Sequence, residues 1–190
     1  MNFLAEAAKK KFLHDDDDND EEGSSFSKYA KNFGHSDEDV EHFQNVASKT
    51  HENLSTGEHD TEIDHENILD NHKKIYESDS VSEHSEKDLG HAAAFEALKK
   101  LATGKSNEID KKALVSLAMS EGLKMWEKKQ SDPSSGNSDE SKGSKDEILS
   151  QACTMAMKLI NTSDKKGNDG EKEESDNKLL NLANSFFQKG

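Results

Sequence analysis

Three stretches in the second half of the chain repeat one five-residue pattern: a small residue, an apolar residue, Lys, any residue and an apolar residue. They lie at residues 97–101, 122–126 and 156–160. Around each pattern, apolar residues recur at the three- and four-residue spacing of one helix face. The repeat therefore predicts three related helices that bury a common face. Its small residues would let the backbones approach closely, and its Lys stems would lie along the surface.

Composition limits how large this core can be. Leu, Ile, Val and Phe account for fewer than one residue in five, and the net charge is −15. An apolar share below ~20 % with high net charge is typical of chains that bury too little apolar surface to fold throughout. Because the apolar residues are clustered, we predict an all-α fold, a small helical bundle of short helices joined by disordered polar linkers.

Boundaries follow from changes in composition and from residues that start or stop helices. Asp110 is a natural N-cap, Gly104 suits a helix end, and Pro133 opens a polar stretch. Helices are expected at residues 91–103, 110–129, 146–161 and 176–188. The predicted organisation is an amphipathic N-terminal helix at 1–13, an acidic linker at 14–24, short acidic, His-rich helices at 25–77, a linker at 78–90, and a C-terminal helical bundle at 91–190 with polar linkers at 131–145 and 162–176.

The nine His residues all lie in the first half of the chain, and one of them, His72, shares a predicted helix face with Ile68 and Ile75. Several His are seven residues apart. Two such His on one helix lie ~10 Å apart, too far to share a zinc ion with ligands at ~2.1 Å. We therefore favour charge compensation over metal binding: protonation near pH 6 would offset the surrounding acids and raise the helix content of residues 14–90.

The residue types that catalysis needs do not occur in a catalytic pattern. A nucleophile requires an adjacent base and an orienting group. The single Cys, Cys153, has apolar neighbours that would raise its pKa and leave it inert. The chain has no phosphate-binding loop, dinucleotide-binding motif or nucleophile elbow, and its carboxylates lie in polar, solvated runs. We predict that the protein is not an enzyme and has no catalytic residue, cofactor or metal.

The charge pattern restricts the partners. The chain contains no Arg, and most of its negative charge lies in residues 14–90. Arg is the main residue of phosphate and base recognition, and an acidic surface repels nucleic acid and anionic lipid. No apolar run reaches the ~18 residues of a membrane span. For residues 1–13, docking on the core is favoured, and weak contact with a membrane surface is the alternative.

A single Cys and the lack of an apolar signal region favour a cytoplasmic location, with the nucleus as the alternative. The first functional hypothesis is a non-catalytic, soluble helical interaction module that takes a protein partner, or self-associates, through helices at 91–160. The second is a largely disordered, hydrophilic, stress-related protein whose helices form on a partner or lipid surface. The candidate partner-binding face consists of Leu98, Leu101, Met119, Leu123, Trp126 and Met157.

Several short segments are similar to one family. They are residues 92–99, 117–120 with 123–124, 156–159 and the terminal 182–186, preceded by a helix that ends in His72 and Tyr76. In this order they resemble the fungal "beta-flanking" proteins, an uncharacterised family. The resemblance implies a soluble helical protein. It brings no activity, ligand or catalytic residue with it.

Overall fold

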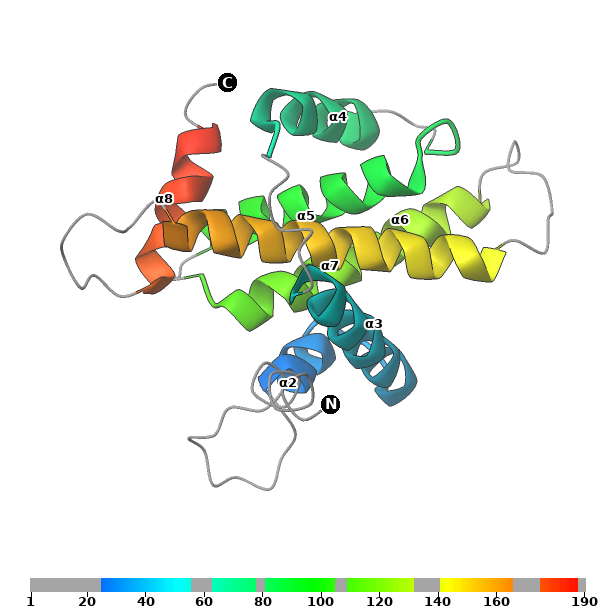
Figure 1. Cartoon of the computed structure of the whole chain (residues 1–190). Helices are drawn as coiled ribbons and strands as arrows, with labels where there is room; N and C mark the ends of the chain where they lie inside the picture. The colour runs from blue at the N-terminus through cyan, green and yellow to red at the C-terminus, as the bar shows by residue number, and fades with distance from the viewer. Residues whose placement is uncertain are drawn as a thin grey trace.

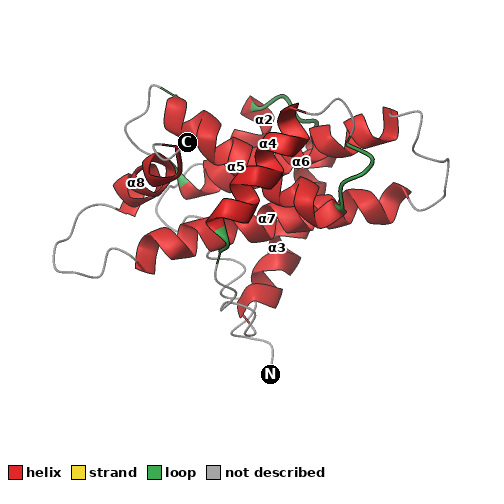
Figure 2. Ribbon diagram, turned by 90° about the horizontal axis from the view of Figure 1, so that it is seen from above, coloured by secondary structure: helices red, strands yellow, loops and turns green. Residues whose placement is uncertain are grey.

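The computed structural model describes residues 25–55, 63–77, 81–104, 109–131, 141–165 and 175–187. Within these ranges the regular structure is helical throughout, without strands (Figure 2). The predicted all-α helical bundle is therefore confirmed. The predicted N-terminal helix at 1–13 and the acidic linker at 14–24 lie outside the described residues.

Three central helices organise the bundle. The helices are α2 (Ser25–Asn32), α3 (Asp37–Ser55), α4 (His65–Glu77), α5 (Glu86–Thr103), α6 (Lys111–Ser131), α7 (Ser141–Lys165) and α8 (Ser175–Phe187). Each of α5, α6 and α7 packs against the other two. In Figure 1, α4 covers α5 on one side of this centre, whereas α2 and α3 lie on the opposite side against α6 and α7. Helix α8 closes one end by packing on α7 and α5.

One apolar core runs through most of these helices. Leu98, Leu117, Ala152 and Leu182, one from each of the four helices expected in the second half, are buried in the same cluster. Side chains of α2, α3 and α4 join that cluster, including the fully buried Phe26. Within the segment at 78–90, Val81 and Leu89 join α4 to the bundle in a second, smaller cluster with Ile75, Met125 and Ile148.

Two glycines mark where the central helices come closest. A Cβ on Gly90 of α5 would lie 2.5 Å from the Gln151 Cβ and 2.8 Å from backbone atoms of Ile148 and Ala152 on α7. A Cβ on Gly122 of α6 would meet the same stretch of α7 at 3.4–3.6 Å, which is ordinary contact. Close approach through a small residue is thus tightest at Gly90, a position that the sequence pattern assigned to a linker.

The predicted linker at 78–90 is wrong over its last five residues, because α5 begins at Glu86. The Ser85 hydroxyl caps α5 by accepting the Asp88 N–H at 3.1 Å. Leu89 and Gly90 are then buried in the first turns. A cap of the Ser-x-x-Asp type, together with this burial, starts the helix earlier than apolar periodicity indicated.

Helix α7 is longer than predicted at both ends and takes residues from both polar linkers, 131–145 and 162–176. Its first turns are anchored by Ser144, whose hydroxyl donates to Glu86 Oε1 at 3.0 Å. Its last turns contain Ser163, which is buried and donates to the Ile160 carbonyl at 2.6 Å. Contacts with the rest of the bundle thus outweigh the low helix propensity of these polar residues.

Candidate functional site: a buried charge network beneath α4

Helix α4 contacts the rest of the bundle through a narrow stripe of buried side chains on one face. Asp64 starts the helix by accepting the Asn67 N–H at 3.1 Å. Ile68, His72 and Ile75 then follow at the i, i+4, i+7 spacing of one helix face and are all buried. The predicted stripe is confirmed, and a titratable side chain occupies its middle.

His72 is bonded to a carboxylate of α5. Its Nε2 lies 2.8 Å from Glu96 Oε2, and the two side chains are only 6 % and 14 % exposed. The His72 ring lies 4.7 Å from the Tyr76 ring and 5.4 Å from the Phe95 ring, measured between centroids. Burial lowers the pKa of His72, and the bond to Glu96 opposes this only in part.

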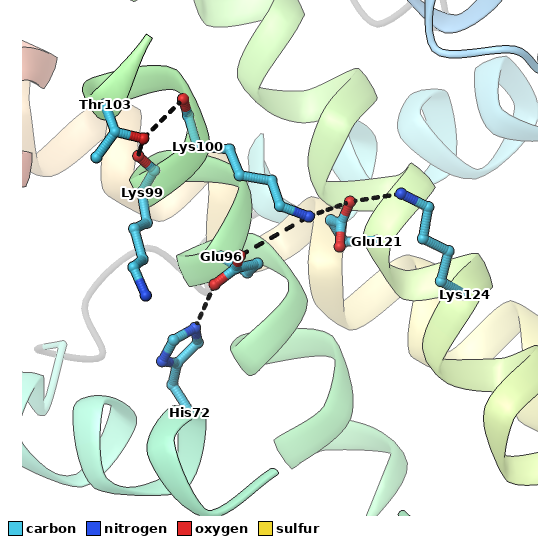
Figure 3. A network of polar contacts seen from close by, with 7 residues as sticks. All are labelled: His72, Glu96, Lys99, Lys100, Thr103, Glu121 and Lys124. Carbon is cyan, nitrogen blue, oxygen red and sulfur yellow. Dashed lines mark hydrogen bonds and ion pairs between the residues drawn. The ribbon is translucent and has the colours of Figure 1, made fainter. Parts of the chain in front are cut away.

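A second, more deeply buried carboxylate lies on α6. The Glu121 side chain is 3 % exposed, and its Oε1 lies 2.9 Å from Lys100 Nζ of α5 and 2.8 Å from Lys124 Nζ of α6. Lys100 Nζ also lies 3.7 Å from Glu96 Oε1, so it joins the two carboxylates (Figure 3). Burial alone would raise the pKa of Glu121, but the two ammonium groups outweigh it and hold that pKa below its usual value.

We call His72, Glu96, Lys100, Glu121 and Lys124 the charge network. It ties α4 to α5 through the hydrogen bond between His72 and Glu96, and α5 to α6 through the ion pair between Lys100 and Glu121 (Figure 3). Each carboxylate has a cationic or imidazole partner, which is the condition for keeping charge inside a fold. The arrangement links three helices and contains one imidazole, His72, whose pKa is lowered by burial.

Tyr76 leaves a defect beside the network. Its hydroxyl is buried and makes no hydrogen bond of good geometry, although the Glu121 carboxylate is close enough to contribute to its raised pKa. Burial, and then the nearby charges of Glu121 and Glu96, raise the pKa of this phenol, so it stays protonated. An unpaired buried hydroxyl costs ~1–3 kcal/mol relative to a satisfied one.

The structure buries four of the six residues of the predicted partner-binding face, and the role of these residues in binding stays a prediction. Leu101 and Trp126 are half-buried at the edge of the core, and their part in binding stays a prediction. The other four are core residues, because the helices that carry them turn these side chains toward one another: Leu98, Met119, Leu123 and Met157.

A Ser–His pair that the sequence pattern did not indicate lies on the opposite side of the bundle. His35 Nε2 lies 2.7 Å from the Ser120 Oγ, and that hydroxyl also donates to the Ser116 carbonyl at 2.8 Å. The Asp39 carboxylate accepts a hydrogen bond from Ser36 instead of orienting the imidazole. Ser120 is buried, so the pair joins the loop between α2 and α3 to α6. The two residues are 85 positions apart, and no local pattern indicates their contact.

Burial shifts the pKa values of Cys153 and His91. The Cys153 thiol is fully buried and its pKa is raised to about 12, mainly by desolvation. This confirms the predicted rise in its pKa. Burial, followed by the charges of Lys87 and Lys158, lowers the pKa of His91 to about 4. His35 shifts in the same direction for the same first cause. At these positions burial favours the neutral imidazole, opposite to the charge compensation expected from the sequence.

The part of the chain that the structure describes offers neither a metal cage nor a membrane span. Among the described residues no group of three or more His, Cys, Asp or Glu side chains is arranged to hold a metal ion. None of the helices α2–α8 combines the length and the apolar character that crossing a bilayer requires.

Comparison with known proteins gives one match. Residues 22–106 match a family model described as Domain of unknown function (DUF7721). No curated protein and no solved structure matches the chain. The matched segment runs from before α2 to just past α5, and so includes His72 and Glu96 but not the α6 half of the charge network. The chain is thus similar to an uncharacterised family over this segment, and the likeness to the "beta-flanking" proteins stays a prediction.

Proposed function

We propose that the protein is a non-catalytic helical interaction module that binds a helix of a partner protein on the face of α5 now covered by α4. One observation carries this proposal: α4 packs on one face of α5 through a short stripe of side chains that holds it only weakly. We call this face of α5, which includes Phe95 and Glu96, the seat. The stripe has two apolar anchors, Ile68 and Ile75, with His72 between them. Tyr76 adds a buried hydroxyl whose hydrogen bonding is poor in geometry.

The free energies of these contacts would allow a partner helix to replace α4 at the seat. An isolated helix of 13 residues is marginal in water, so α4 depends on its contacts. Each buried Ile contributes ~1.5–3 kcal/mol, whereas the unpaired Tyr76 hydroxyl costs ~1–3 kcal/mol. Among the helices α4 packs chiefly against α5. A helix with the same apolar spacing and no such defect would compete for the seat.

The seat also defines the chemistry of its occupant. It fits an amphipathic helix with two apolar residues seven positions apart, the spacing of Ile68 and Ile75. Between them it fits a hydrogen-bond donor that reaches Glu96 Oε2, as His72 Nε2 does at 2.8 Å. At the position of Tyr76 it fits an aromatic ring without a hydroxyl.

The non-catalytic part of the proposal is supported by the state of the reactive groups. The Cys153 thiol is fully buried with a raised pKa. The Ser120 hydroxyl bonds to the Ser116 carbonyl inside α6. Both carboxylates of the charge network bond to basic or imidazole side chains, which suits a structural role better than general acid–base catalysis.

The test uses a labelled synthetic peptide with the sequence of residues 64–77 as the probe. In the native chain α4 competes with the peptide at an effective concentration of order 1 mM. An Ile75→Asp chain, whose own α4 binds poorly, should therefore bind the peptide at least ~10-fold more tightly than the native chain does. A peptide carrying Phe in place of Tyr76 should bind more tightly still.

The control is a peptide with Asp at both Ile positions, which should not bind. Far-ultraviolet circular dichroism must show that the Ile75→Asp chain keeps its helices. If that chain unfolds, a peptide with a photoreactive group in place of Ile75 is cross-linked to the native chain instead, and α5 should be labelled. Equal binding of the native and control peptides would rule out the seat.

A further inference from the structure

We infer that α4 is an acid-released cover: protonation of His72 loosens α4 from α5 and opens the helix seat. The use of the opened seat by a partner rests on the proposed function, but the release of α4 does not. The inference stands on where His72 is placed, in the middle of the apolar stripe by which α4 is held.

The packing around the imidazole leaves little room for hydration. The His72 side chain is 6 % exposed and lies between the rings of Tyr76 and Phe95. Phe95 in turn touches Phe186 and Phe187 of α8, with ring centroids 5.2 and 5.3 Å away. A charged imidazolium at this position would lose most of its water, which disfavours it.

Charged groups around His72 do not add up to one strong attraction. Glu96 lies 2.8 Å away and favours the protonated ring, but it is itself shared with Lys100 at 3.7 Å. The groups that face this region come from three helices: Tyr76 and Glu77 on α4, Glu96, Lys99 and Lys100 on α5, and Glu121 and Lys124 on α6. The three Lys residues offset the three acids, so desolvation remains the largest influence on the His72 imidazole and favours its neutral form.

The direction of the pH effect on the docking of α4 follows from the linkage between protonation of His72 and docking. In a released α4 the imidazole is solvated, with an ordinary pKa of ~6.5. In the docked helix the pKa of His72 is lowered, with burial as the largest cause. The released state therefore binds the proton more readily, and the docking free energy, fully present above pH ~6.5, decreases as the pH falls below that value.

The experiment is amide hydrogen exchange on the intact native chain at pH 7.5 and pH 5.5, with rates corrected for the intrinsic effect of pH. Protection of the amides of residues 68–76 should fall at pH 5.5 by at least ~2-fold relative to the amides of residues 114–123 in α6. In a His72→Gln chain, which keeps a donor for Glu96 and cannot titrate, this relative loss should disappear. A His84→Gln chain is the matched control and should behave as the native chain does.

Two results would overturn the inference. One is unchanged or increased protection of α4 at pH 5.5 in the native chain, which means that the imidazolium tightens its pair with Glu96. The other is a pH response that survives in the His72→Gln chain. If His72→Gln removes protection at both pH values, nuclear magnetic resonance titration of the native imidazole decides: His72 must titrate below the ~6.5 of a solvated imidazole. Peptide binding to the Ile75→Asp chain at pH 7.5 tests the seat separately.

Discussion

The bundle holds its helices together by two different kinds of seam. Where α5 and α6 pack on α7, at what we call the dry seam, the closest contacts are apolar or backbone: Gly90 and Gly122 bring the two helices against one stretch of α7, and Ala152 is fully buried there. Between α4, α5 and α6 the contact contains the charge network, with Glu121 only 3 % exposed. The dry seam depends on shape and the charged seam on protonation state. One chain therefore combines a seam of close apolar packing with a seam of buried charge.

The largest effect is expected at the dry seam, from Gly90→Ala. The added Cβ would lie 2.5 Å from the Gln151 Cβ and 2.8 Å from two backbone atoms of α7, which cannot rotate away. The free energy of unfolding should fall by ~3 kcal/mol or more, because α5 and α7 must move apart. Chemical denaturation measures the loss.

Gly122→Ala is the matched control for that change. Its Cβ would have ordinary contacts at 3.4–3.6 Å, and Ala favours a helix interior by up to ~1 kcal/mol over Gly. We expect stability that is unchanged or slightly raised. If both variants lose equal stability, close approach is not what distinguishes this seam.

At the charged seam, the double change Lys100→Met with Lys124→Met should cost ~2–3 kcal/mol at pH 7. It leaves the Glu121 carboxylate buried without a cation, whereas either single change leaves one ammonium at Oε1 and should cost only ~0.5 kcal/mol. The double variant should also invert its pH response. With both Lys removed, burial raises the folded-state pKa of Glu121 above its unfolded value, so stability is present at low pH and falls as the pH rises through that pKa.

Thermal denaturation of the native chain, the two single variants and the double variant at pH 4.5 and 7 checks both statements. Single-variant losses that simply add up to the double-variant loss would contradict the shared role of the two Lys residues.

A smaller loss is expected when the native chain is acidified. The folded-state pKa of His91 is about 4, below the ordinary ~6.5 of the unfolded chain. The unfolded state then binds more protons between these values, so stability is fully present above pH ~6.5 and decreases toward pH 4. We expect a loss on the order of 1 kcal/mol from His91 between pH 7 and pH 5. A His91→Gln chain should lose less stability over this interval in the same thermal measurement. A gain of helix content on acidification would instead restore the charge-compensation hypothesis.

The sequence predicted the buried apolar faces better than the contacts between charged side chains, for a physical reason. Apolar periodicity is local, so the order of residues alone indicates the buried faces of α4, α6 and α7, including the stripe of Ile68, His72 and Ile75. Gly90 was missed because a helix that begins with a polar cap and a glycine gives no apolar period. The network pairs His72 with Glu96 and Lys100 with Glu121, which lie on different helices. Such pairs depend on crossing geometry, which spacing along the chain does not encode.

The smallest effect, and one of opposite sign, is expected from Tyr76→Phe. The change removes a buried hydroxyl that has no hydrogen bond of good geometry and keeps the ring that packs against His72 at 4.7 Å. The free energy of unfolding should rise by ~0.5–1 kcal/mol, since the desolvation of the hydroxyl is no longer opposed to folding. Tyr29→Phe, at the only other tyrosine, is the control and should bring no gain, because Tyr29 has interactions of its own. Denaturant titration with Trp126 fluorescence resolves the difference, since Trp126 packs on the same apolar cluster as Tyr76. A loss of stability in Tyr76→Phe would mean that the hydroxyl is satisfied in solution, and the charged seam would then be as complete as the dry one.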